Sequence, residues 1–247
     1  DLALEFRNMG SCVVVEFGHG TAGHDLATVC MEKPMAFLTG GPGTGKTTAI
    51  AEALPVWIQA FQKRHDRTPV VRLCAPTGKA ALRMTAALSR HLAAHAKNWP
   101  DPLIAALPTA ALTVHRLLRK HSITGHSPYS ALKPLSVDML VLDEASMVDL
   151  PMLVAVLDAL PAQAMILLVG DPKQLPSVEL GNVLGTLLPG STENSLLKRL
   201  GMAHRHLSLN YRQAESPGLT QLSKDMVDAT CAQVLQNLQG NNYPGVI

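Results

Sequence analysis

The stretch Gly40-Gly-Pro-Gly-Thr-Gly-Lys-Thr-Thr48 decides the fold class of this 247-residue chain. It follows the short apolar run of residues 36–39 and precedes a helical pattern over residues 46–66. It therefore fits the pattern G-x-x-x-x-G-K-[ST] at a junction between a strand and a helix. Glycines let successive backbone N–H groups surround a phosphate, and the helix N-terminus adds a favourable partial charge. The stretch predicts a phosphate-binding loop and a bound nucleotide.

Each residue type in such a loop has its own task. The ammonium of Lys46 reaches the β- and γ-phosphates, and the hydroxyl of Thr47 binds Mg²⁺. The residues expected to bind the nucleotide are Gly40, Gly41, Pro42, Gly43, Thr44, Gly45, Lys46, Thr47 and Thr48.

Three more apolar runs, residues 70–75, 139–143 and 164–169, are expected to be strands. Their apolar residues are continuous rather than alternating, which is typical of strands covered on both faces. Helical stretches separate the strands, so we predict an α/β fold with a mainly parallel sheet and helices on both faces. The other expected elements are a helix over 78–97, a loop over 98–108, a short basic helix over 113–120 and a strand within 12–17.

An acidic pair, Asp143-Glu144, directly follows the apolar run Met139–Leu142. Ligands of open α/β sheets bind at the carboxyl ends of the strands, so the pair is expected beside the loop. There Asp143 would hold Mg²⁺, and Glu144 would orient and deprotonate the attacking water. In a chain without the loop, a solvated helix cap would be the better interpretation.

Two further candidates contact the γ-phosphate in this interpretation. Gln174 follows Gly170-Asp171, and its amide can donate to a phosphate oxygen while accepting from a water. An ordinary Gly-Asp-Pro turn is the alternative there. Arg212 follows Tyr211, and its guanidinium would stabilise negative charge in the transition state. A surface ion pair is the alternative for this arginine.

Two junctions carry candidates for nucleic-acid binding. Thr77 and Lys79 lie where a predicted strand meets a predicted helix. The full phosphate-loop spacing is missing, so a nucleic-acid backbone fits better than a second nucleotide. His115 and Arg116 lie on the short basic helix. A plain helix start and an ordinary basic surface helix remain the alternatives.

Composition excludes several classes of protein. There are 21 Lys and Arg against 19 Asp and Glu, and this near-balance excludes a binder that works by bulk positive charge. A hydrophobic share of 47% excludes a mostly disordered chain. No apolar run approaches the ~18 residues of a membrane span, and the start does not resemble a signal peptide. The four cysteines form no C-x-x-C pair, so we expect no zinc site and a reducing, cytoplasmic location.

Six segments in this order resemble the successive motifs of RecD-like superfamily 1B DNA helicases: residues 40–48, 75–81, 113–118, 141–150, 168–185 and 210–213. The resemblance implies a RecA-like P-loop lobe with ATP and Mg²⁺ as cofactors. It also implies movement 5′ to 3′ along single-stranded DNA during double-strand break repair and recombination. The implied catalytic residues are Lys46, Asp143, Glu144, Gln174 and Arg212. The implied metal-binding residues are Thr47 and Asp143. The implied DNA-binding residues are Thr77, Lys79, His115 and Arg116.

The resemblance also implies a division of the chain. Residues 1–34 are unassigned, 35–212 form the ATPase lobe, and 213–247 begin a truncated following segment. Within the lobe, residues 121–138 are expected to be a small exposed hairpin with short strands at Ser122–Thr124 and around Leu132.

The implied partners are single-stranded DNA and other subunits of an exodeoxyribonuclease V complex. Similar helicases carry an adenine-reading Gln upstream of the loop, but the corresponding stretch, residues 22–27, contains none.

The motifs of a second lobe are also missing, so we expect the first motor lobe of a helicase. A nucleotide- or DNA-binding remnant without turnover, or a fragment that docks to partner subunits, stays open as the alternative. The Asp-Glu pair argues against a P-loop kinase.

Overall fold

A computed structural model describes residues 14–16, 22–95, 97, 99–121, 125–172, 174, 184, 188, 203–207, 218, 221–222, 225–226, 229–240 and 242–244. The chain forms two compact units. The first comprises Asp1–Gly40 and Lys46–Leu207, and the second comprises Gly41–Gly45 and Ser208–Ile247. The second unit contains helix α11 (Cys231–Gln239), which begins with a capping box between Thr230 and Gln233.

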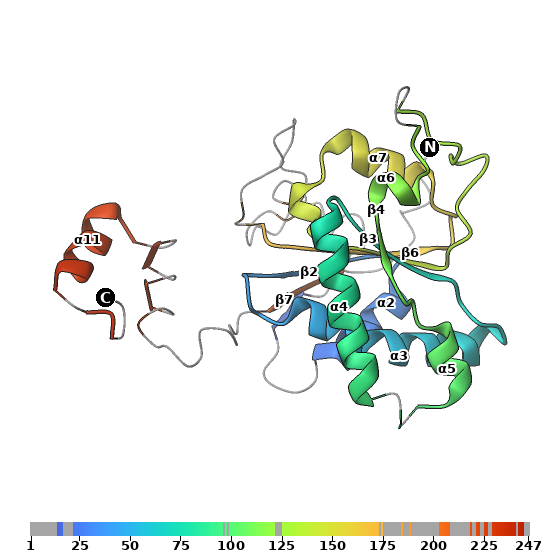
Figure 1. Ribbon diagram of the computed structural model, residues 1–247, viewed down its shortest axis with the longest axis horizontal. Coiled ribbons are helices and arrows are strands. Elements are labelled where there is room, and N and C mark those ends of the chain that lie inside the picture. Colours follow the sequence, from blue (N-terminus) through green and yellow to red (C-terminus); the bar gives the residue numbers. More distant parts are fainter. Residues whose placement is uncertain are drawn as a thin grey trace. The chain divides into compact units, whose positions relative to one another are not determined.

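A parallel sheet of seven strands forms the centre of the first unit, in the order β1-β7-β2-β6-β5-β3-β4 (Figure 1). Every neighbouring pair is parallel. The strands are β1 (Val14–Glu16), β2 (Met35–Gly40), β3 (Val71–Ala75), β4 (Ala111–Thr113), β5 (Met139–Leu142), β6 (Met165–Gly170) and β7 (Ala203–Leu207). All residues of β2, β5 and β6 are buried, as their continuous apolar runs predict. The predicted α/β class with a parallel sheet is confirmed.

Helices cover both faces of this sheet (Figure 1). One apolar core lies under α2 (Ala22–Glu32), α3 (Lys46–His65), α4 (Gly78–His95) and α5 (Asp101–Ala106). The other lies under α6 (Val114–Leu117), the 3₁₀ helix η3 (Ala145–Met147) and α7 (Leu150–Asp158). Successive residues of β2 alternate between the two cores, because side chains of a strand point to opposite faces of a sheet.

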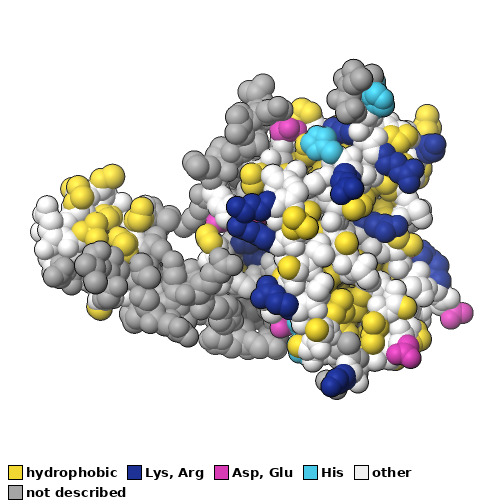
Figure 2. Space-filling model, in the orientation of Figure 1, with side chains coloured by type: hydrophobic (Ala, Val, Ile, Leu, Met, Phe, Trp, Pro, Cys, Tyr) yellow, Lys and Arg dark blue, Asp and Glu magenta, His cyan; other side chains and the backbone are white. Residues whose placement is uncertain are grey.

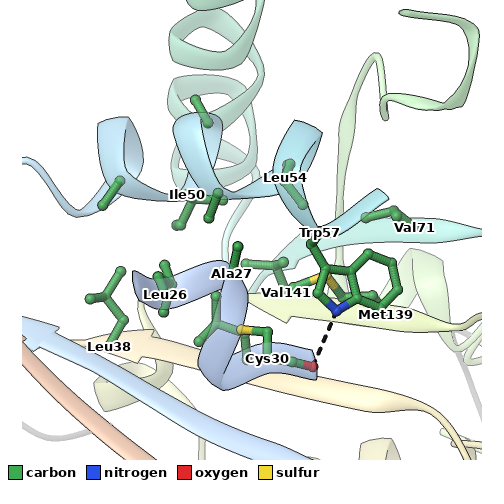
Figure 3. Packing of buried hydrophobic residues seen from close by; sticks show 14 of the residues in the cluster. Leu26, Ala27, Cys30, Leu38, Ile50, Leu54, Trp57, Val71, Met139 and Val141 are labelled. Atoms are coloured by element: carbon green, nitrogen blue, oxygen red, sulfur yellow. Dashed lines mark hydrogen bonds between the residues drawn. The ribbon is translucent and has the colours of Figure 1, made fainter. Parts of the chain in front are cut away.

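Packing between α2 and α3 joins the N-terminal part of the chain to the sheet (Figure 3). The indole N–H of Trp57 donates a hydrogen bond to the Cys30 carbonyl at 3.1 Å. Ala27 is fully buried, and its small side chain lets the two helices approach closely. Helix α3 continues through Pro55 without a break. Four residues of α2, a segment that the sequence left unassigned, are therefore part of the core of the first unit: Leu26, Ala27, Val29 and Cys30.

The predicted loop over residues 98–108 is wrong, because α5 lies within it. Pro100 is the N-cap and Pro102 lies in the first turn, where a helix loses nothing through a missing N–H. Leu103 and Leu107 are buried and anchor the helix.

The region predicted as a small insertion is mostly exposed and does not join the central sheet where it is described. Ser130 and Lys133 form an antiparallel bridge, and their backbone hydrogen bonds measure 3.1 and 2.9 Å. Leu132 lies in the turn between them with 98% of its surface exposed, so its predicted place in a strand is wrong. The other predicted strand, Ser122–Thr124, lies outside the described residues. No helix in the described part of the chain combines the length and apolar character that a bilayer crossing requires.

Candidate nucleotide site

The glycine-rich loop, Gly41–Gly45, connects the end of β2 to the start of α3. Gly43 and Gly45 have φ angles of 81° and 86°, a region that other residues rarely adopt. The backbone N–H and the hydroxyl of Thr44 both donate to the Gly41 carbonyl, at 3.4 and 2.9 Å. The backbone thus has the form that requires glycine at these two positions.

Lys46 is the first residue of α3 and is half-buried. Its ammonium donates a hydrogen bond of 2.6 Å to the carbonyl of Gly40, the last residue of β2. Thr47 and Thr48 follow in the first turn of α3, a helix that the structure describes throughout and whose first turn has no acidic residue. The positive end of this helix is therefore available to an anion.

Asp143 directly follows β5, and two backbone contacts hold it. Its N–H donates to the Cys74 carbonyl at the end of β3, and its carboxylate accepts the Glu144 N–H, both at 2.9 Å. Burial is the main cause that raises the pKa of Asp143 to about 6. The Glu144 N–H lowers this pKa, the Glu144 charge raises it and the Lys46 charge lowers it. Lys46 and Asp143, far apart in sequence, therefore lie within electrostatic reach of each other.

Glu144 is held in the left-handed region, with φ 51° and ψ 41°. Outside glycine this conformation costs about 1–2 kcal/mol, and such strain is often stored at functional sites. Glu144 is the N-cap of η3, and its carbonyl accepts the Met147 N–H at 2.9 Å. The turn directs the chain away from β5 immediately after the two carboxylates.

The residues after β6 form a turn at the same edge of the sheet. Asp171 is buried, and the Gln174 N–H donates to its carbonyl at 3.1 Å. The turn expected as the alternative is therefore present, and it holds the half-buried Gln174 close to the end of β6. Arg212 lies outside the described residues.

The two basic junctions lie side by side, because β3 and β4 are neighbours with Ala75 opposite Thr113. Thr77 accepts the Ala80 N–H at 3.2 Å at the start of α4, and Thr113 accepts the Arg116 N–H at 3.3 Å. Both hydroxyls thus cap helices, as the alternative interpretation expects. The side chains of Thr77, Lys79, His115 and Arg116 are all exposed.

Burial of Asp143 gives a prediction about stability. Its pKa rises from 3.8 to about 6 on folding, so the folded chain binds this proton more tightly. The contribution of Asp143 to wild-type stability therefore decreases as pH rises from about 4 to 6, by about 3 kcal/mol in all. We expect Asp143→Asn to raise the free energy of unfolding at pH 7.5 by up to that amount, and to have little effect near pH 4.

Urea unfolding in metal-free buffer from pH 4.5 to 7.5 checks this difference. Burial lowers the pKa of His204 to about 4, but His204 is common to both proteins and cancels in the difference. The control is Asp158→Asn, an exposed residue at the end of α7. A difference between wild type and Asp143→Asn that does not change with pH would contradict the burial argument.

A glycine-rich loop between a buried parallel strand and a helix, with carboxylates after a nearby strand, defines a RecA-like P-loop α/β protein. The AAA domain family matches residues 25–180, which is more than half of the chain. The chain belongs to this family.

Several proteins are similar to a large part of the chain. It is 40% identical over 160 residues to the RecBCD enzyme subunit RecD of Haemophilus influenzae, covering 64% of this chain and 24% of that protein. It is 38% identical over 167 residues to RecD of Mycolicibacterium smegmatis, covering 66% and 29%. It is 36% identical over 157 residues to the ATP-dependent RecD2 DNA helicase of Deinococcus radiodurans, covering 60% and 17%. The predicted resemblance to RecD-like helicases is confirmed, and the chain spans between a sixth and a third of the length of these relatives.

Proposed function

We propose that this chain is the ATP-binding and ATP-hydrolysing lobe of a DNA helicase that moves 5′ to 3′ in double-strand break repair and recombination. One observation carries the proposal: Lys46 at the start of α3 and Asp143 at the end of β5 lie within electrostatic reach at the carboxyl edge of a parallel sheet. The similarity to RecD and RecD2 supports a helicase rather than another P-loop enzyme.

In this proposal the ammonium of Lys46 leaves the Gly40 carbonyl and binds the β- and γ-phosphates. The residues present suit Mg²⁺, which takes few protein ligands and shares phosphate and water oxygens. Thr47 and Asp143 would hold it, and when bound it neutralises charge on the phosphates. No cage of three or more His, Cys, Asp or Glu side chains occurs among the described residues, so a self-contained metal centre has no support there.

Glu144 would accept the proton of the attacking water. Gln174 and Arg212 would contact the γ-phosphate from the turn after β6 and from the segment after β7. Residues 22–27 contain no Gln, so they offer no glutamine amide to contact adenine.

The proposed track for single-stranded DNA is the β4 edge of the sheet, where α4 covers one face of the sheet and α6 the other. Figure 2 shows Lys and Arg side chains spread over this side of the first unit. Helix α4 contains no acidic residue, and a side chain added at Gly78 would meet nothing within 4 Å, so the start of the helix is open to solvent. Its exposed Lys and Arg residues are Lys79, Arg83 and Arg90, and those on and directly after α6 are Arg116 and Arg119; His115 of α6 is exposed as well.

Replacing Lys79 with alanine tests this track. We expect Lys79→Ala to weaken binding of a fluorescent oligo(dT) roughly 3- to 10-fold at low salt. The slope of log K against log salt should become shallower by about 0.7, because one phosphate contact is lost. Lys63→Ala, at the exposed end of α3, is the matched control and should leave affinity and slope unchanged. Equal effects of the two variants would show binding by general charge and would contradict a specific track.

The similarity to RecD subunits also supports other subunits of an exodeoxyribonuclease V complex as partners. Copurification of the whole protein with such subunits would test this part, and its absence would favour a helicase that works alone.

A further inference from the structure

The side-chain oxygen of Ser146 is buried and has no hydrogen-bond partner in the described structure. Only 1% of the residue is exposed. A buried hydroxyl has given up its bonds to water, so native proteins rarely leave one unpaired. The other hydroxyl-bearing residues that are buried in the described part of the chain, Thr39, Thr44 and Tyr243, each have a hydrogen-bond partner for that hydroxyl. Ser146 therefore calls for an explanation beyond packing.

Ser146 lies between two parts of the candidate site. It is the middle residue of η3, two positions after Glu144, whose backbone is strained. The same short helix is pressed against the end of β6: a Cβ added to Gly170 would come within 3.2 Å of the Ser146 nitrogen and 3.4 Å of the Ala145 nitrogen. The turn that carries Gln174 begins directly after Gly170. The backbone of Ser146, two residues after the end of the acidic pair, thus packs against Gly170, directly before the turn that carries Gln174.

We propose that Ser146 is a positioning residue whose hydroxyl donates a hydrogen bond to the Gln174 side chain when a nucleoside triphosphate is bound. This inference rests on the proposed function, because it needs a γ-phosphate beside Gln174. The chemistry of the amide suits both contacts at once: its NH₂ group donates to a phosphate oxygen, and its carbonyl oxygen accepts the Ser146 hydroxyl. Binding of the triphosphate would then link the turn that carries Glu144 to the turn that carries Gln174.

Replacing Ser146 with alanine should not lower the thermal stability of the free chain, but it should lower the affinity for a nucleoside triphosphate. In the free chain the lost hydroxyl had no partner, so the Tm of Ser146→Ala should be unchanged or higher by about 2–4 °C. Affinity for Mg²⁺ and the analogue AMP-PNP should fall about 3- to 10-fold, the usual worth of one hydrogen bond, while affinity for ADP stays the same. Calorimetry measures all three quantities.

Ser127→Ala is the matched control. The hydroxyl of Ser127 donates to the Leu118 carbonyl at 2.8 Å and accepts the Tyr129 N–H at 3.1 Å. Its removal should lower the Tm and leave the ratio of AMP-PNP to ADP affinity unchanged. If Ser146→Ala behaved like Ser127→Ala, Ser146 would be an ordinary structural residue and the inference would fail.

A double-mutant cycle with Gln174→Ala tests the named partner. Once Gln174 is alanine, Ser146→Ala should cause no further loss of AMP-PNP affinity. Independent, additive losses would overturn the proposed bond. A wild-type chain that binds ADP and AMP-PNP, with a Ser146→Ala variant of equal affinities, would overturn this inference alone. A chain that binds neither nucleotide would overturn the proposed function as well.

Discussion

Glu144→Gln is expected to abolish ATP hydrolysis almost completely while leaving ATP binding intact. The amide has nearly the shape of the carboxylate but cannot accept the proton of the attacking water, and general-base catalysis is worth about 100- to 10,000-fold. Glu144 contributes only main-chain atoms to two hydrogen bonds of this turn, so they remain: its N–H still donates to the Asp143 carboxylate, and its carbonyl still accepts the Met147 N–H. The loss should therefore fall on the chemical step.

Single-turnover hydrolysis, with the chain in excess over radiolabelled ATP, measures this loss even if the chain is slow. Glu52→Gln makes the same chemical change at an exposed position of α3 and should hydrolyse ATP at the wild-type rate. Retained hydrolysis in Glu144→Gln would exclude Glu144 as the base. Lost hydrolysis accompanied by lost ATP binding would mean that the substitution damaged the site rather than its chemistry.

Lys46→Ala is expected to weaken Mg²⁺-ATP binding by about 10- to 100-fold, because a charge-assisted contact to phosphate is worth about 1.5–3 kcal/mol. The free chain should remain folded, since Lys46 is only half-buried and lies at the first residue of its helix. Titration calorimetry gives the affinity, and circular dichroism checks the fold. Lys63→Ala, in the last turn of the same helix, is the control. Equal ATP affinities for these two variants would contradict the assignment of the loop.

Strands β2, β3, β5 and β6 could be predicted because each is a local apolar run that crosses the core. Strand β7 could not, since His204, Arg205 and His206 occupy its middle. Its polarity is compensated by a distant residue: the Thr39 hydroxyl lies 2.7 Å from His204 Nε2 and 2.9 Å from His206 Nδ1. A pairing across 165 residues leaves no local pattern.

The candidate site also has features that the sequence predicts and features that only the structure reveals. The loop, Lys46 and the acidic pair lie in fixed-spacing motifs next to predicted strands, so the sequence alone places them at one edge of a parallel sheet. The strained backbone of Glu144 and the unpaired hydroxyl of Ser146 depend on how η3 packs against Gly170, which is a contact between distant segments. Sequence motifs thus predict which groups are candidates for the site, while the backbone strain of Glu144 and the missing partner of Ser146 become visible only in the structure.

A crystal structure of the chain with Mg²⁺ and AMP-PNP is the most direct test of the central claim, that this lobe binds and hydrolyses ATP through the loop after β2. The account predicts phosphates against the backbone of residues 41–45, with Lys46 moved from the Gly40 carbonyl to the β- and γ-phosphates. It also predicts Mg²⁺ on Thr47 and Asp143. A nucleotide bound elsewhere, or one that leaves Lys46 on the Gly40 carbonyl and Asp143 away from the metal, would contradict it.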